Sequence, residues 1–195
     1  MSGGAPVRSS PFRGVLLLAR GRADGLALFR ATPDGFLASL APLLAAPLAG
    51  AVLLLAGGHL VPAVALSLLA VVTQLAPPVL SHAVARAWGR DAGWLRYATA
   101  YNWCQWAVLA VMLALLAALA AATGAPPSAV AGSRAFAYLS AAYALWLHWL
   151  VARHGLGLSR WRAGLLVLLV SFGVAVLVLG PTLAQLLAAR AGGRA

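Results

Sequence analysis

The sequence has almost no negative charge: it contains no glutamate and only three acidic residues. These are Asp24, Asp34 and Asp91, and all of them fall outside the long apolar runs. Catalysis by paired carboxylates and proton relay through the membrane both need acids inside the fold. The patterns H-E-x-x-H, G-x-S-x-G and G-x-x-x-x-G-K-[ST] are also missing. We therefore predict no enzyme and no catalytic residue.

Cysteine and lysine are equally scarce. The single cysteine, Cys104, excludes an internal disulfide and any site built from several cysteines, and we expect no cofactor and no metal ion. Lysine is absent, so all 14 basic residues are arginine. The net charge of +11 resembles that of a nucleic-acid-binding protein, but the arginines stand in short clusters between apolar runs. That pattern is typical of membrane-protein loops, so we expect no nucleic-acid partner.

Apolar residues are abundant, at 63% of the chain against 9% charged residues. Soluble domains have about 45–50% and about 25%, so the composition predicts a polytopic membrane protein. The wealth of Ala, Leu, Gly and Arg is typical of a GC-rich bacterial genome, which favours a bacterial inner membrane.

Five apolar runs are long enough for membrane helices, which need about 20 residues each. We expect an all-α bundle over residues 33–190, with a disordered tail at 1–10 and a short C-terminal tail at 191–195. Before the first run, Thr32 is a suitable N-cap, with Pro33 and Asp34 in the first turn. The predicted spans are 36–56, 60–84, 94–122, 135–151 and 164–188.

The arginines are distributed unevenly between the predicted sides of the membrane. Five precede the first span, three follow the second and three follow the fourth. On the other side one lies between the third and fourth spans, and two lie at the end. The positive-inside rule therefore predicts a cytoplasmic N-terminus and a C-terminus outside.

The segment before the first span, residues 11–31, predicts an amphipathic interfacial helix. At a helical rotation of 100° per residue, its apolar side chains fall on one side of the helix. Its glycines lower the stability of the helix. Four arginines would lie near anionic lipid on the cytoplasmic leaflet. The alternative is a cytoplasmic helix packed on loops of the bundle itself. The proposed lipid-surface arginines are Arg13, Arg20, Arg22 and Arg30.

Polar residues inside the spans predict a layer in the cytoplasmic half of the bilayer. At a rise of about 1.5 Å per residue, they fall at similar depths. Pro77 and Pro78 deprive the carbonyls of Thr73 and Gln74 of their helical donors, and a span-three amide is the expected replacement. The candidate layer comprises Gln74, His82, Asn102, Gln105 and His148.

These polar groups have several possible roles. The simplest is interhelical hydrogen bonding, worth about 0.6 kcal/mol per pair on average. The alternatives are a ligand or ion site in a transporter or channel, and a haem held by His82 and His148, which would have to face each other. The consecutive position of the two polar-rich helices and the odd number of spans argue against an inverted repeat.

An amphipathic lead-in followed by five spans and short loops resembles the layout of the Yip family over about residues 33–190. TPDGFLASLAP, Thr32–Pro42, occupies the place of the DLYGP stretch of eukaryotic members, which is absent here. The resemblance implies a trafficking or membrane-organising role and transfers no binding residue. We expect a non-enzymatic accessory protein, with the lipid bilayer, other membrane proteins or a second copy as partners. The alternative is a small-solute or ion transporter or channel.

Overall fold

The computed structural model describes residues 10–192, with side chains as far as Gly180. Over this range the chain is helical and has no strand, and five helices are long and apolar enough to cross a membrane. This confirms the all-α, five-span prediction and makes the chain a multi-pass membrane protein. The predicted tails fall largely outside the described residues. The elements are α1 (Pro11–Ala19), the 3-10 helix η1 (Ala23–Leu28), α2 (Pro33–Ala56), α3 (Leu60–Ala87), the 3-10 helix η2 (Asp91–Gly93), α4 (Trp94–Thr123), α5 (Pro127–Ala131), α6 (Arg134–Gly155) and α7 (Arg160–Gly192).

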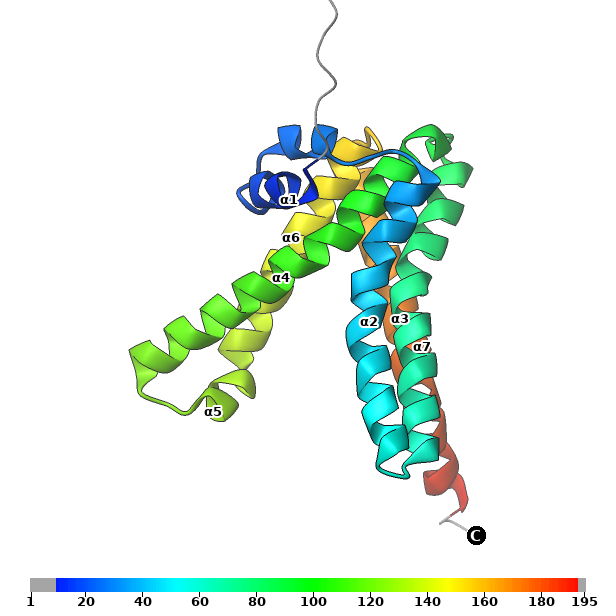
Figure 1. Ribbon diagram of the computed structural model, residues 1–195, viewed down its shortest axis with the longest axis vertical. Coiled ribbons are helices and arrows are strands. Elements are labelled where there is room, and N and C mark those ends of the chain that lie inside the picture. Colours follow the sequence, from blue (N-terminus) through cyan, green and yellow to red (C-terminus); the bar gives the residue numbers. More distant parts are fainter. Residues whose placement is uncertain (1–9, 193–195) are drawn as a thin grey trace, which may run out of the picture.

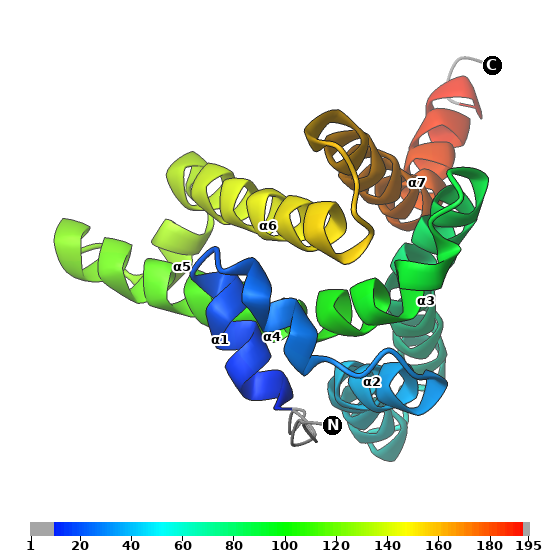
Figure 2. The same ribbon diagram turned by 90° about the horizontal axis from the view of Figure 1, so that it is seen from above.

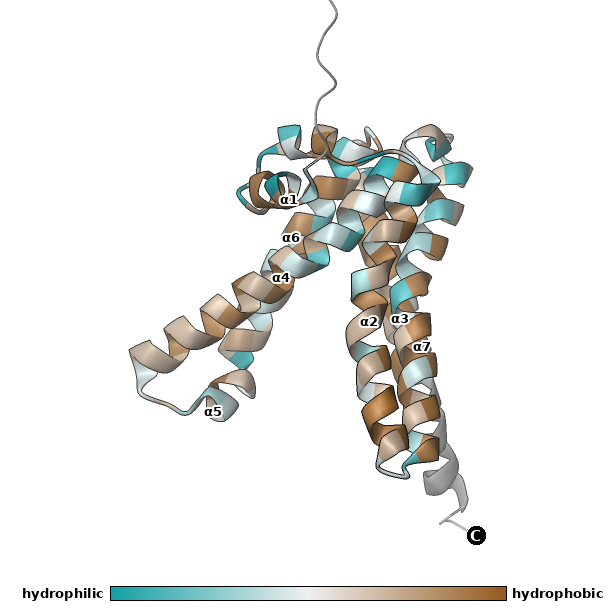
Figure 3. Ribbon diagram, in the orientation of Figure 1, coloured by the Kyte–Doolittle hydropathy of each residue, from teal (hydrophilic) through white to brown (hydrophobic). Residues whose placement is uncertain are grey.

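The long helices form two groups that meet at one end of the molecule and diverge toward the other (Figure 1). One group contains α2, α3 and α7, and the other contains α4 and α6, with the short α5 at its far end. Figure 2 shows α1 lying across α4 and α6 at the joined end. The α3–α4 and α6–α7 connections lie at this end too. We call it the arginine-rich end, because ten described arginines lie in the segments or helix turns at this end: Arg13, Arg20, Arg22, Arg30, Arg86, Arg90, Arg96, Arg153, Arg160 and Arg162. Polar residues gather there (Figure 3).

Local chemistry explains the ends of the helices. The Thr32 hydroxyl accepts a hydrogen bond from the Gly35 N–H at 3.1 Å, which makes it the N-cap of α2 as predicted. Ser133 caps α6 in the same way, accepting from the Phe136 N–H at 3.2 Å. α4 ends at Thr123, and its C-cap Gly124 has a left-handed φ of +67°. The helices extend past the predicted spans by a few residues: α6 ends at Gly155 instead of residue 151, and α7 covers Arg160–Gly192 instead of 164–188.

The buried core lies at the arginine-rich end. In α4 every buried residue falls between Tyr97 and Val108, although the helix continues to Thr123. In α7 the buried side chains fall between Ala163 and Val170 among the described residues. Beyond these positions the described side chains of α4 and α7 are half-buried or exposed, and the exposed apolar ones would contact lipid. Within the described residues, the main core therefore joins the two groups at the arginine-rich end.

The segment 11–31 is not the single helix that we predicted. It divides into α1 and η1, because Gly21 takes a φ of +79° and Arg22 is extended. The two pieces cross where Gly14 faces Gly25: a Cβ on Gly25 would lie 2.6 Å from the Gly14 carbonyl oxygen. The glycines that weaken a continuous helix thus permit a close crossing of two short ones.

The segment packs on one face and leaves another exposed. Leu18 is fully buried in the core, as are Leu26 and Phe29. Phe12 and Leu16 of α1 are 76% and 51% exposed. Among the spans, this segment packs on helices α4 and α6. The four proposed lipid-surface arginines are all exposed: Arg13, Arg20, Arg22 and Arg30.

Candidate polar site at the arginine-rich end

A buried amide–hydroxyl pair joins α4 to α2. The Asn102 Nδ2–H donates to Ser39 Oγ at 2.9 Å, and the Ser39 hydroxyl donates to the Phe36 carbonyl at 2.6 Å. Asn102 is 2% exposed and Ser39 is 1% exposed. The Ser39 hydroxyl is both donor and acceptor here, so it links the Asn102 amide to the α2 backbone by two successive hydrogen bonds. A polar group without water nearby is stabilised when it is paired in this way.

This pairing corrects one expectation. We predicted that an amide of α4 would donate to the carbonyls freed by Pro77 and Pro78, whereas Asn102 donates to α2. α3 runs through both prolines without ending. Gln74, one of the residues with a freed carbonyl, is half-buried and its side chain makes no hydrogen bond within the described residues. Ser39 is the partner of Asn102 that the sequence did not predict.

A second polar contact joins α4 to α3. The Trp94 indole N–H donates to Ser81 Oγ at 3.2 Å, and the Ser81 hydroxyl donates to the Pro78 carbonyl at 3.1 Å. His82 is exposed, and its ring lies against Trp94 with centroids 4.5 Å apart. His82 therefore faces out of the bundle, on an apolar hollow that also involves Phe36 and Val79. The adjacent serine, not the predicted histidine, makes the interhelical hydrogen bond.

His148 lies in the contact between α6 and α4. Its ring packs against Tyr101 with centroids 4.4 Å apart. Its Nε2 is buried and has no hydrogen-bond partner among the described residues. The half-buried Gln105 lies one turn from Tyr101 on the same helix and approaches the Tyr101 hydroxyl. Ser140, about two turns from His148 on the same helix, also has a buried hydroxyl oxygen without a partner among the described residues.

The candidate layer is thus three separate contacts. Asn102 belongs to the α2–α4 contact, His82 borders the α3–α4 contact, and His148 with Gln105 belongs to the α4–α6 contact. His82 and His148 pack on different aromatic rings, so the structure does not show the facing pair that haem would need. Within residues 10–180, no group of three or more His, Cys, Asp or Glu side chains could hold a metal ion.

The charged side chains surround this site without entering it. Arg22 and Asp24 form the one ion pair among the described residues, at 2.7 Å. The hydrogen bond from Arg22 holds the pKa of Asp24 below its ordinary value. Two other arginines lie over tryptophan rings: Arg153 at 5.3 Å from Trp149 and Arg162 at 6.0 Å from Trp88. Such contacts stabilise cations next to an apolar surface.

Comparison with protein-family models, with curated proteins and with solved structures finds no match to this chain.

Proposed function

We propose that this chain is a non-enzymatic accessory protein of a bacterial inner membrane, which organises the bilayer or assembles with other membrane proteins or a second copy. The main support for the proposal is that buried polar side chains form hydrogen bonds between helices. Asn102 pairs with Ser39 and Trp94 pairs with Ser81, each across two helices. These groups hold helices together, which is the role that interhelical hydrogen bonds most often have in membranes.

The apolar surface supports the same proposal. α4 and α6 diverge from α2, α3 and α7, and large side chains on the diverging parts are exposed. These exposed apolar side chains are suited to contact with lipid chains or with apolar helices of a partner protein. The five-span layout also resembles that of the Yip family, whose implied role is membrane organisation.

The arginines support the proposed orientation. Ten described arginines lie in α1, η1 and the segments that connect spans at one end, or in the adjacent helix turns: Arg13, Arg20, Arg22, Arg30, Arg86, Arg90, Arg96, Arg153, Arg160 and Arg162. Arg134 begins α6 at the opposite end. The positive-inside rule then favours a cytoplasmic arginine-rich end.

The alternative function, a small-solute or ion transporter or channel, has one observation in its favour. The His148 Nε2 is buried beside Tyr101 without a partner among the described residues, and such a nitrogen can bind a polar solute. We expect purified protein in sealed vesicles to give no more ion or solute flux than empty vesicles. Flux that His148→Leu abolishes would favour the transporter and contradict the proposed function.

Replacing Asn102 and Gln105 together with leucine separates the two functions further. If the amides hold helices together, the double variant should melt at a lower temperature in detergent. An unchanged melting temperature combined with a lost cellular phenotype would instead favour a binding site. Gln105→Leu alone is the matched control, because its side chain crosses to no other helix by a hydrogen bond among the described residues.

A further inference from the structure

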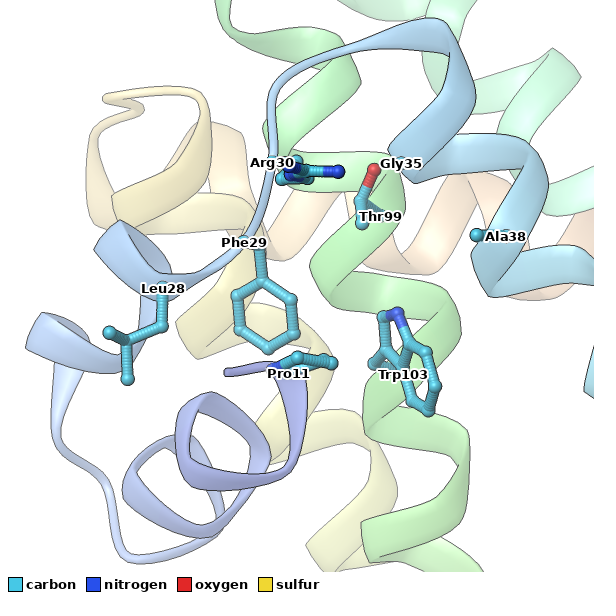
Figure 4. A pocket seen from close by; sticks show the side chains of 8 residues that line it. All are labelled: Pro11, Leu28, Phe29, Arg30, Gly35, Ala38, Thr99 and Trp103. Carbon is cyan, nitrogen blue, oxygen red and sulfur yellow. The ribbon is translucent and has the colours of Figure 1, made fainter. Parts of the chain in front are cut away.

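A small hollow lies where the η1–α2 connection passes over α4 (Figure 4). Its volume is about 130 Å³. Phe29 and Trp103 stand on two sides of it, and Arg30 lies at its edge. An apolar cavity of about 150 Å³ accommodates a benzene molecule, so this hollow has room for a group of about that size. The lining residues are Pro11, Leu28, Phe29, Arg30, Gly35, Ala38, Thr99 and Trp103.

The local sequence shapes this hollow. Phe29 follows η1 in an extended conformation and is buried, with its ring against Gly14. The chain then turns into α2 so closely that a Cβ on Gly35 would lie 2.8 Å from the Arg30 Cβ and 3.0 Å from its carbonyl oxygen. Only glycine fits at position 35 without a shift, so the tight turn places Arg30 over the first turn of α2.

The hollow combines one cation with apolar walls. Arg30 is exposed and forms no ion pair among the described residues. The other polar groups of the lining are the Trp103 indole N–H and the Thr99 hydroxyl, which donates to the Leu95 carbonyl at 2.8 Å. The Thr99 hydroxyl oxygen can therefore act only as an acceptor toward the hollow. The Arg30 guanidinium, a donor, points toward it in Figure 4. Asp34 is exposed in the first turn of α2 and is not part of the lining.

The hollow lies at the arginine-rich end of α2 and α4, beside the start of the α2 span, where we expect lipid headgroups. Below it, α2 and α4 diverge (Figure 1). A ligand with a negative group at the Arg30 level and an apolar chain below would match both the charge of Arg30 and the divergence of α2 and α4 below it. Basic pockets between membrane helices bind anionic headgroups by this complementarity.

We propose that the hollow binds one anionic phospholipid. Arg30 holds the phosphate by charge-assisted hydrogen bonds. Phe29, Trp103 and Ala38 contact the glycerol and the first acyl carbons, and the remaining acyl chain descends between α2 and α4. The site goes beyond the proposed function, because an accessory protein does not require a selective lipid site.

The test compares lipids on the full chain in nanodiscs of phosphatidylcholine, with and without added phosphatidylglycerol. Binding of lipid to the folded state should raise the melting temperature of the wild type by about 2–4 °C. Native mass spectrometry measures retention of phosphatidylglycerol directly. Arg30→Gln should weaken that retention about tenfold, which is the effect expected for one lost charge-assisted contact.

Two further variants separate the hollow from the general surface charge. Ala38→Leu fills the hollow and keeps every charge, so it should lose the lipid-induced shift as Arg30→Gln does. Arg20→Gln removes an exposed arginine outside the lining and should keep the shift. The melting temperature of each variant in pure phosphatidylcholine shows whether it is folded before lipid is added.

Three results would overturn the proposal. An equal loss in Arg20→Gln would assign the effect to surface charge, and a full shift in Ala38→Leu would show that the hollow is not occupied. An equal shift with inorganic phosphate would show an ion site without a lipid. Each of these outcomes leaves the flux and stability tests of the proposed function unaffected.

Discussion

At the residue scale, the Asn102–Ser39 pair shows how a buried amide is accommodated inside an apolar helix. Asn102 was identifiable from the sequence because a carboxamide in a lipid-spanning run needs a partner. Ser39 was not identified, although it lies about 9 Å along α2 at 1.5 Å per residue, close to the predicted depth of Asn102. A lone serine in a span often bonds only to its own helix, as Ser67 does with the Ala63 carbonyl. The sequence alone therefore did not distinguish Ser39, which bonds to another helix, from serines that bond only to their own helix.

Ser39→Ala should destabilise the protein more than Asn102→Leu does. The alanine leaves the Asn102 amide buried and without its acceptor, a cost of about 1–3 kcal/mol. The leucine removes that amide, and Ser39 keeps its bond to the Phe36 carbonyl. Thermal unfolding in detergent measures both variants.

Ser67→Ala provides the matched control for this comparison. It deletes the same hydroxyl from a half-buried site whose bond stays within α3. We expect a melting temperature close to that of the wild type. If Ser67→Ala and Ser39→Ala lowered it equally, the interhelical bond would have no special contribution.

Arg22→Gln should raise the pKa of Asp24 toward its ordinary value, since the hydrogen bond from Arg22 is the largest cause of the lowering. A lowered folded-state pKa stabilises the protein above the ordinary carboxyl range, and this contribution is lost as pH falls through the folded-state pKa. Both side chains are exposed, so the effect on unfolding is small. An NMR titration of the Asp24 carboxyl measures the shift directly, and an unchanged titration would contradict the pairing.

At the element scale, the crossing of α1 and η1 depends on two facing glycines. Gly25→Ala would place a methyl group 2.6 Å from the Gly14 carbonyl oxygen, so backbone atoms must move. We expect a loss of about 1–3 kcal/mol, measured as a lower unfolding midpoint. Proteolysis of the segment 20–31 should also become faster.

Gly164→Ala is the control for the glycine experiment. Gly164 lies in α7 with nothing within 4 Å of an added Cβ. Alanine in a helix is favoured over glycine by about 0.5–1 kcal/mol, so this variant should be neutral or slightly stabilised. A loss equal to that of Gly25→Ala would contradict the close-crossing explanation.

The elements themselves were largely predictable. The five apolar runs and the Thr32 cap are strong local signals, so the long helices appear with bounds close to those expected. The division of residues 11–31 was not predictable, because Gly14, Gly21 and Gly25 fit a weakened helix as well as a crossing of two short ones. Only the tertiary contact of Gly14 with Gly25 decides between the two. The same limit applies to Leu18, because its burial in the core depends on tertiary packing against other helices.

At the scale of the whole molecule, the alternating ends of the five spans make the topology testable. The α2–α3 turn at Gly58 lies at the end opposite the α3–α4 connection at Gly89. A reporter active only in the periplasm should be active at Gly58 and at Ala195, and inactive at Gly89. A cytosol-only reporter should give the reverse pattern. Activity of the periplasmic reporter at Gly89 would invert the proposed orientation.

The divergence of the two helix groups also has a mechanical consequence for the surrounding lipid. The outline of the protein is broader in the leaflet away from the arginine-rich end (Figure 1). A protein of this shape occupies a larger area in one leaflet than in the other. The strain on the bilayer is smallest where the leaflet around the broader end forms the convex side of a curved membrane. The molecule would then sort between flat and curved membranes by shape alone. Enrichment on narrow membrane tubes pulled from larger vesicles, compared with the flat parent surface, would measure that preference.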